Sequence, residues 1–222
     1  MKAFLNRIAG LRGRKKDKIR VQKINLQRRL GIQDEFTYFY RTDIIDIMEK
    51  KEITSFDVLI EIPKGSRNKY EYDFALKKVR YDRMIFSSMM YPADYGFVPE
   101  TLALDGDPLD VLVLVTEPTF PGCVMEVKPI GVFHMTDEKG PDEKIICVPM
   151  SDPIWNKVNN LEELNPHLIK EIEHFFKVYK DLEKKKVDVG GWGDVLEAKE
   201  IVANCIQRFV ESDIPAKQVS IK

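Results

Sequence analysis

Three carboxylates directly before an aliphatic run restrict the folds that this sequence can adopt. In residues 102–115, LALDGDPLDVLVLV, Asp105, Asp107 and Asp110 fall within six positions and lead directly into an aliphatic run. Such a run is typical of a buried strand. Two like charges about 4 Å apart repel each other by roughly 1 kcal/mol in water and roughly 4 kcal/mol near a protein surface. The fold must therefore bring positive charge to the mouth of this strand.

Several other segments alternate in polarity as half-buried strands do. Residues 56–62, FDVLIEI, follow this period, and a Pro and a Gly end the run. In residues 69–74, KYEYDF, the alternation places Lys69 and Glu71 on the same face. The remaining strand-like segments are 81–87, 111–115, 123–135 and 144–150.

Two helices are predicted after these strands. The first has Asn165 as its N-cap and Pro166 at its first position, and the second begins near Asp194. Both carry apolar residues at helical spacing. Many short strands followed by helices, without strict alternation of the two, favour an α+β fold built on a small antiparallel barrel or sheet.

Length and composition allow one substantial core. The chain has 222 residues, of which 44% are hydrophobic, so we expect a single domain. No apolar run reaches the roughly 18 residues of a membrane span, and the N-terminus lacks the pattern of a secretory signal. The three cysteines, at 123, 147 and 205, lack the spacing of a zinc site or a disulfide framework. We expect buried free thiols and a cytoplasmic protein without a membrane span.

The net charge of −1 hides a strong asymmetry. Residues 1–30 hold eleven Lys and Arg against one Asp, a net charge of +10, and the remaining 192 residues carry −11. An acidic body without clustered Lys and Arg is not expected to bind nucleic acid, but it can attract metal ions. We predict a basic extension over residues 1–47, disordered or partly helical, and a single domain over residues 48–222.

Three readings of the extension stay open. Its Arg content resembles that of an organelle transit peptide, although it has almost no serine, and this reading makes the protein organellar. It can instead be a basic tail that touches membrane or nucleic acid. The third reading is that the natural chain begins at Met48, the next methionine after Met1. Such a chain keeps 175 of the 222 residues.

A second acidic turn, MTDEKGPDEK at residues 135–144, places Asp137 and Asp142 on either side of a Gly-Pro bend. Alone, each acidic turn is an ordinary solvated bend. The first turn is not an EF-hand loop, because Asp110 and Thr116 stand where that loop needs Gly and Glu. Together, two carboxylate-rich turns provide the oxygen ligands of a hard cation such as Mg²⁺.

Four cationic residues are embedded among aromatic or acidic ones, and they are Lys69, Arg83, Lys144 and Lys180. In YPADYGF, Tyr91 and Tyr95 flank Asp94 in a predicted turn. For any single cation, a surface salt bridge is a sufficient explanation. As a group, the cations and phenol hydroxyls predict a pocket for an anionic substrate.

Six segments in this order closely resemble the soluble family I inorganic pyrophosphatases: IEIPKGSRNKYEYD, YDRMIF, YPADYGFVP, DGDPLDVLVL, MTDEKGPDEK and HFFKVYKDLEK. The likeness covers about residues 55–210. It implies an α+β fold with a small antiparallel, OB-like β-barrel and two flanking C-terminal helices. The implied reaction is the Mg²⁺-dependent hydrolysis of pyrophosphate to two orthophosphates by a metal-activated water. It also implies a homo-oligomer, a hexamer by analogy with bacterial relatives.

The resemblance assigns a role to each matching residue. Several Mg²⁺ ions, for which Mn²⁺ or Zn²⁺ can substitute, are expected on Asp105, Asp110, Asp137 and Asp142, with Asp107 as the general base. The expected substrate-binding residues are Lys69, Arg83, Tyr95, Lys144, Tyr179 and Lys180. The expected supporting residues are Glu61, Glu71 and Tyr91. The likeness departs at the second acidic turn, where Lys139 and Pro141 replace the usual Ala and Glu.

Two rival functions remain. One is a metal-dependent phosphohydrolase or nucleotidyl transferase acting on nucleotides, which is weakened because no G-x-x-x-x-G-K-[ST] loop is present. The other is a non-catalytic, acidic metal-binding or scaffold domain with a basic interaction tail. For the lead function, relief of carboxylate crowding predicts that Asp110→Ala abolishes activity without harming the metal-free fold.

Overall fold

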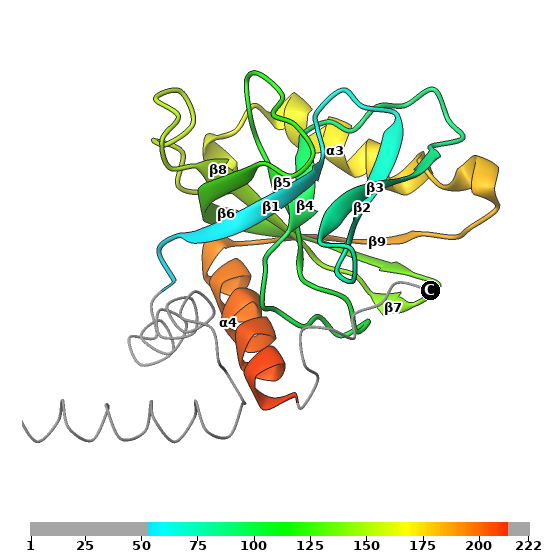
Figure 1. Ribbon diagram of the computed structural model, residues 1–222. Coiled ribbons are helices and arrows are strands. Elements are labelled where there is room, and N and C mark those ends of the chain that lie inside the picture. The colour runs from blue at the N-terminus through cyan, green and yellow to red at the C-terminus, as the bar shows by residue number, and fades with distance from the viewer. Residues whose placement is uncertain (1–52, 213–222) are drawn as a thin grey trace, which may run out of the picture. The chain divides into compact units, whose positions relative to one another are not determined.

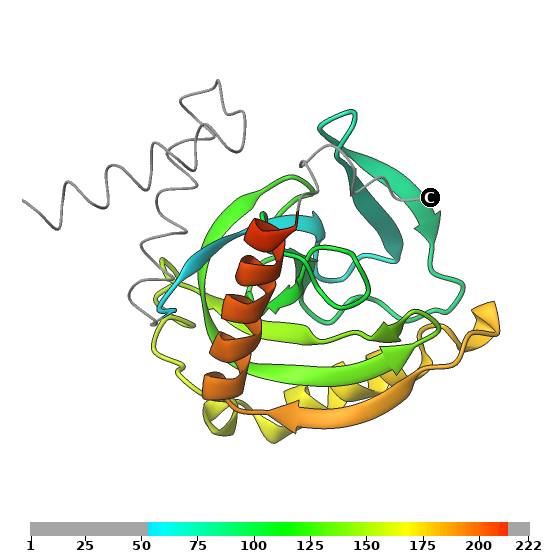
Figure 2. The ribbon, with the colours of Figure 1, turned by 90° about the horizontal axis from the view of Figure 1, so that it is seen from below.

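Five strands close into a barrel in the computed structural model, which describes residues 53–212. The strands are β1 (Phe56–Ile62), β4 (Asp94–Phe97), β5 (Asp110–Val113), β6 (Val124–Asp137) and β8 (Lys144–Pro149). β1 pairs with β4 and also with β6, so the order β1-β4-β5-β8-β6 returns to its start. Figure 2 shows the strands curling around, with α4 packed across them. This confirms the predicted OB-like barrel.

One pairing in the barrel differs from the predicted antiparallel arrangement. β5 and β8 run parallel, with Asp110 opposite Lys144 and Val111 opposite Ile145. The other barrel pairings are antiparallel. Parallel neighbours begin at the same edge of a sheet. The two acidic turns precede these two strands, so the turns meet at one end of the barrel.

A two-stranded ribbon made by β2 (Asn68–Asp73) and β3 (Lys78–Met84) forms a sheet of its own beside the barrel (Figure 1). Lys69 is the register partner of Arg83, so the ribbon presents both cations together. β3 begins three residues before the predicted segment, which started at residue 81. The predicted alternation in β2 is confirmed, because Lys69 and Glu71 form an ion pair.

Three strands were not predicted from the sequence. β4 falls in the YPADYGF segment that was predicted to be a turn, and Gly96 lets it approach β1, because a Cβ there would lie 2.0 Å from Leu59 O. β9 (Asp188–Gly193) pairs with β6, and the two-residue β7 (Gly140–Pro141) closes a hairpin with the end of β6.

Both helices begin where their caps predicted. α3 (Pro166–Val178) follows Asn165, whose side chain accepts a hydrogen bond from His167 N. α4 (Val195–Glu211) follows Asp194, whose side chain accepts from two backbone amides. Short 3-10 turns, η1 (Leu161–Glu163) and η2 (Asp181–Glu183), flank α3. Neither helix combines the length and apolar character that crossing a membrane requires.

Aromatic rings join α3 to the barrel. Phe176 packs on Phe133 of β6 at a centroid distance of 5.6 Å, and Phe175 packs on Tyr91 at 4.9 Å. Tyr91 in turn lies 5.5 Å from Tyr95 of β4. This layer fixes the two tyrosines that the sequence placed in the candidate pocket.

Asp94 carried no predicted role, and Cys123 was predicted to be buried. Asp94 is fully buried and accepts hydrogen bonds from Lys64 N, Thr119 N and Thr119 Oγ1, so it clamps two loops and does not face the pocket. Cys123 is partly exposed, since it precedes the edge of β6, whereas Cys147 and Cys205 are buried. All three thiols are free, as predicted.

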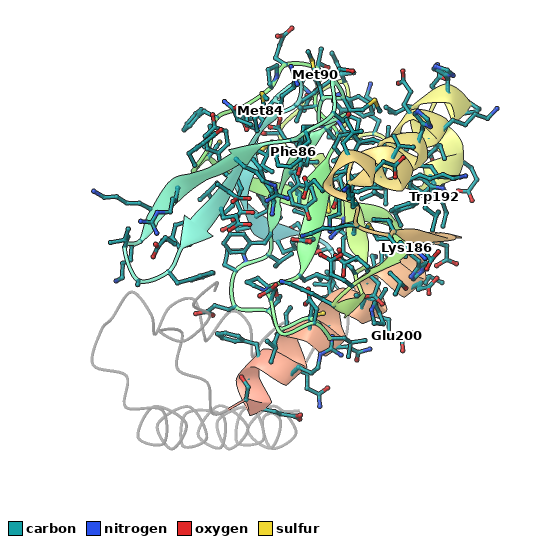
Figure 3. The ribbon with its side chains drawn as sticks, turned by 90° about the vertical axis from the view of Figure 1, so that its right-hand side faces the viewer. Met84, Phe86, Met90, Lys186, Trp192 and Glu200 are labelled. Carbon is teal, nitrogen blue, oxygen red and sulfur yellow. The ribbon has the colours of Figure 1, made fainter. Side chains whose placement is uncertain are left out.

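Figure 3 shows the exposed Met84, Phe86 and Met90 near one another, far from Glu200 on α4.

Candidate active site

All the site residues predicted from the sequence line one cleft of about 360 Å³ at the end of the barrel where β5 and β8 begin. They come from the two acidic turns, β1, the β2–β3 ribbon, β4 and the end of α3. The full set is Glu61, Lys69, Glu71, Arg83, Tyr91, Tyr95, Asp105, Asp107, Asp110, Asp137, Asp142, Lys144, Tyr179 and Lys180. Segments more than 100 residues apart in the sequence are thus brought together.

The carboxylates of the first acidic turn are crowded. Asp105 Oδ1 accepts a hydrogen bond of 3.1 Å from Asp107 N, which shapes the turn. Burial raises the pKa of Asp105, and the neighbouring charges of Asp107 and Asp110 raise it further. Burial also raises the pKa of Asp142 to about 6, with Asp110 adding to the shift. The cleft therefore holds more negative charge than its own cations neutralise at these positions.

Lys144 holds the two acidic turns together. Its ammonium group donates to both Asp110 and Asp142, and its side chain is only 2% exposed. Burial alone would lower the pKa of Lys144, but the two carboxylates raise it above its ordinary value. A permanently charged lysine therefore lies at the floor of the cleft.

A second buried pair fixes the other turn. Lys180 Nζ lies 2.8 Å from Asp137 Oδ2, and the side chains are 12% and 8% exposed. Burial raises the pKa of Asp137, but the hydrogen bond from Lys180 outweighs it, so the pKa lies below its ordinary range. Lys139 N also donates to Asp137, at 2.8 Å. The end of α3 is in this way tied to the hairpin that carries Asp137.

The β2–β3 ribbon supplies the cations of the opposite wall. Lys69 Nζ lies 2.6 Å from Glu71 Oε1 and 3.8 Å from Asp82 Oδ2. Arg83 contacts Asp82 and forms a fork with Glu183 of η2, at 2.9 Å for its shortest contact. These cations are held by carboxylates and line the same cleft as the acidic turns.

Tyrosine hydroxyls complete the polar lining. The Tyr95 hydroxyl donates a 2.5 Å hydrogen bond to Asp110 Oδ2. Tyr179 caps the C-terminus of α3, next to Lys180. Burial raises the pKa values of Tyr95 and Tyr179, so both stay protonated and can donate hydrogen bonds to an anion.

Glu61 lies on β1 at the inner end of the cleft. Its Oε1 accepts a 2.6 Å hydrogen bond from Tyr72 N in the ribbon. Burial raises the pKa of Glu61 to about 8 in spite of this hydrogen bond, and Asp110 contributes to the rise. Below about pH 8 the neutral form of the Glu61 carboxyl group therefore predominates. In that form it still accepts the hydrogen bond from Tyr72 N that joins the ribbon to the barrel.

Sequence reasoning missed several residues of the cleft. Asp82 of YDRMIF and Lys139 of MTDEKGPDEK both line the cleft, but no role was predicted for either side chain. Glu183 does not line the cleft itself, but it follows Lys180 by three positions and holds Arg83, which does. Lys185 also lines the cleft and pairs with Glu138 at 2.9 Å. Strand alternation would place Asp82 on the opposite face from Arg83, and only the register shift at Lys69 and Tyr70 brings both to the cleft. No local signal indicated Glu183.

The donor chemistry of the cleft fits hard divalent cations. Among residues 53–212, no three His, Cys, Asp or Glu side chains are grouped as a ready-made ligand set. Instead, Lys139, Lys144 and Lys180 each hold a carboxylate of the two turns. Mg²⁺ needs only one or two carboxylates per ion, together with waters and substrate phosphates. The oxygen-rich lining satisfies that need.

Comparison with known proteins gives a consistent result. Residues 58–210 match the family model described as inorganic pyrophosphatase. An inorganic pyrophosphatase of Methanosarcina mazei is 58% identical over 154 residues, which cover 69% of this chain and 91% of the relative. That of Halalkalibacterium halodurans is 51% identical over 162 residues, covering 73% and 98%. The solved structure of the Thermus thermophilus inorganic pyrophosphatase has a TM-score of 0.69 at 45% identity, covering 70% of this chain and 91% of that one.

The matched region contains both acidic turns, the ribbon and α3, all of which contribute residues to the cleft. The fold, the sequence and the residues of the cleft agree on one family. The chain belongs to the inorganic pyrophosphatase family.

Proposed function

We propose that this cleft hydrolyses inorganic pyrophosphate with bound Mg²⁺ and with Asp107 as the general base. Hydrolysis of the diphosphate bond to two orthophosphates follows from membership of the family. The metal and the role of each residue are what we propose in addition. The observation that carries the proposal is the convergence of two acidic turns and a set of cations on one cleft.

The two acidic turns would hold the metal ions. Asp105 and Asp110 come from the first turn, and Asp137 and Asp142 from the second. Mg²⁺ is the proposed ion, with Mn²⁺ or Zn²⁺ as substitutes, because all the ligands are oxygens. When bound, such ions lower the pKa of a coordinated water and neutralise phosphate oxygens.

Asp107 is the carboxylate best placed to accept a proton from the attacking water. Its side chain is 39% exposed, so it reaches the open part of the cleft. Asp110 and Asp142, in contrast, are held by buried Lys144. A general base must reach the proton that it removes, and such a base contributes roughly 10²- to 10⁴-fold to a rate.

The cations and hydroxyls around the cleft would bind the two phosphates. The proposed contacts are Lys69, Arg83, Tyr95, Lys144, Tyr179 and Lys180. Negative charge builds up on the leaving phosphate as the anhydride bond breaks, and preorganised donors stabilise that charge. Glu61, Glu71 and Tyr91 would support this wall, since Glu71 orients Lys69 and Tyr91 packs on Tyr95.

The predicted homo-oligomer and the cytoplasmic location stay predictions. The extension predicted over residues 1–47, and with it the domain boundary at Met48, lies outside the described part of the chain.

One assay tests the proposal against its rivals. Orthophosphate release is measured from pyrophosphate and from ATP, with Mg²⁺ and with a chelator. We expect rapid, Mg²⁺-dependent release from pyrophosphate and a loss of at least about 100-fold in Asp107→Asn. Asp188→Asn, an exposed carboxylate outside the cleft, should retain full activity. Activity on ATP alone would support the nucleotide hydrolase, and no turnover would support the scaffold domain.

A further inference from the structure

Lys139 bridges the two acidic turns from the tip of the β6–β7 hairpin. Its backbone N–H donates to Asp137 Oδ1 at 2.8 Å, which fixes the start of the side chain. Its ammonium Nζ then reaches across the cleft to Asp107 Oδ2, at 2.7 Å. The carboxylate proposed as the general base thus carries a cation supplied by the neighbouring turn.

This pair differs in its exposure from the lysine pairs that hold Asp110, Asp137 and Asp142. The side chains of Lys144 and Lys180 are 2% and 12% exposed, whereas that of Lys139 is 59% exposed. Breaking a buried pair leaves an uncompensated charge away from water. An exposed lysine returns to solvent at little cost, because surface ion pairs contribute about 0–1 kcal/mol. Among the three lysines that hold aspartates of the two acidic turns, Lys139 is therefore the one that can leave its carboxylate without disturbing the fold.

We propose that Lys139 is a displaceable internal counter-ion, which occupies Asp107 in the metal-free protein and must leave when divalent cations gather on the two acidic turns. The inference rests on the metal site of the proposed function. Lys139 contacts both turns, since its Nζ lies 2.7 Å from Asp107 Oδ2 and its backbone N lies 2.8 Å from Asp137 Oδ1. The same carboxylates attract a divalent ion more strongly than a single ammonium group, because its charge is twice as large.

The consequence concerns metal affinity. A cation that must be displaced competes with Mg²⁺, so Lys139 raises the concentration of free Mg²⁺ at which the cleft fills. It also offsets the charge of Asp107 in the crowded first turn while no metal is bound. Removing Lys139 should therefore strengthen the binding of Mg²⁺ in the absence of any substrate.

The test is a calorimetric titration of Mg²⁺ into the full, metal-stripped chain without pyrophosphate. In Lys139→Met the apparent Kd for Mg²⁺ should fall by about two- to five-fold, the range that an exposed ion pair allows. Lys139→Arg keeps the charge and should stay close to the unsubstituted protein. Circular dichroism should show the same fold in each variant, because the side chain is largely exposed.

Lys185→Met is the matched control. Lys185 lines the same cleft and pairs with Glu138, one residue before Lys139, but it does not contact Asp107. Its removal changes the net charge equally, so it measures the long-range effect of losing one cation. In an Asp107→Asn background, Lys139→Met should produce only the shift seen for this control.

Two results would overturn the inference in distinguishable ways. An unchanged Kd in Lys139→Met, or an equal shift in Lys185→Met, would show that the contact with Asp107 does not compete with metal, while the metal site itself stands. No binding of Mg²⁺ by the unsubstituted chain would remove the proposed metal site and this inference together.

Discussion

Lys144 and Asp110 are direct partners in the parallel pairing of β5 with β8, and their side chains form an ion pair at the floor of the cleft. The pairing of these strands therefore sets the distance between the two acidic turns. Lys144 also holds Asp142 of the second turn. A single buried ammonium group therefore lies between two carboxylates that would otherwise repel each other, and its one positive charge offsets part of theirs.

Replacing Lys144 should damage stability as well as catalysis. In Lys144→Met, Asp110 and Asp142 lose their buried partner, and breaking such a pair costs about 3–5 kcal/mol of unfolding free energy. Mg²⁺ should restore part of the loss, because a divalent cation replaces the missing charge. Urea unfolding in chelator and in Mg²⁺ measures both effects. Equal stability of the variant and the parent in chelator would contradict the proposed role of Lys144.

Asp110 and Asp105 should respond differently to removal. Crowding alone predicts that Asp110→Ala does not harm the fold, but the structure reverses this expectation, because Lys144 and the Tyr95 hydroxyl both depend on Asp110. We expect a loss of about 1–3 kcal/mol, because the Tyr95 hydroxyl loses its acceptor and Lys144 keeps only Asp142. Asp105→Ala should be neutral or stabilising, since burial and neighbouring carboxylates already raise the pKa of Asp105. Unfolding of both variants in chelator checks the contrast, and activity should be lost in both.

Local sequence patterns predicted many of the strands and helices, but little of which strands pair with one another. Alternation located β1, and the caps Asn165 and Asp194 located the helix starts, because both signals are local. β4 and β9 were missed, since a four-residue strand and a Gly-rich one carry too few apolar positions to show a period. The parallel pairing of β5 with β8 depends on contacts across the whole barrel.

The same division holds in the cleft. The residues named through family likeness all line the cleft. They could be identified from the sequence because their motifs are short and occur in a fixed order. Their partners were not predicted. The contacts of Lys139 with Asp107 and of Glu183 with Arg83 join segments about 30 and 100 residues apart, and no local period reports such contacts.

Glu61 should make stability depend on pH. Its pKa is about 8 in the folded protein and 4.5 in an exposed glutamate, chiefly because of burial. The folded state therefore binds the proton more tightly, so this stabilisation is complete below pH 4.5 and is lost as pH rises through about 8. Glu61→Gln should remove the dependence, a difference of a few kcal/mol and at most about 5 kcal/mol. Urea unfolding at pH 5 and pH 9 in chelator measures it, and parallel behaviour of the two proteins would contradict the prediction.

Glu183 should act on substrate binding by orienting Arg83. It is a positioning residue, because it forms the fork with the guanidinium and is itself only 7% exposed. In Glu183→Gln, Arg83 keeps only Asp82 as an ionic partner and turns away from the substrate. Hydrogen bonds to charged groups contribute about 1.5–3 kcal/mol, so we expect KM for pyrophosphate to rise roughly tenfold or more, with a smaller change in kcat. Steady-state kinetics measures the split. Asp73→Asn, which breaks a similar pair with exposed Arg80 outside the cleft, is the control, and an equal rise of KM in both variants would show that Glu183 supports only the ribbon.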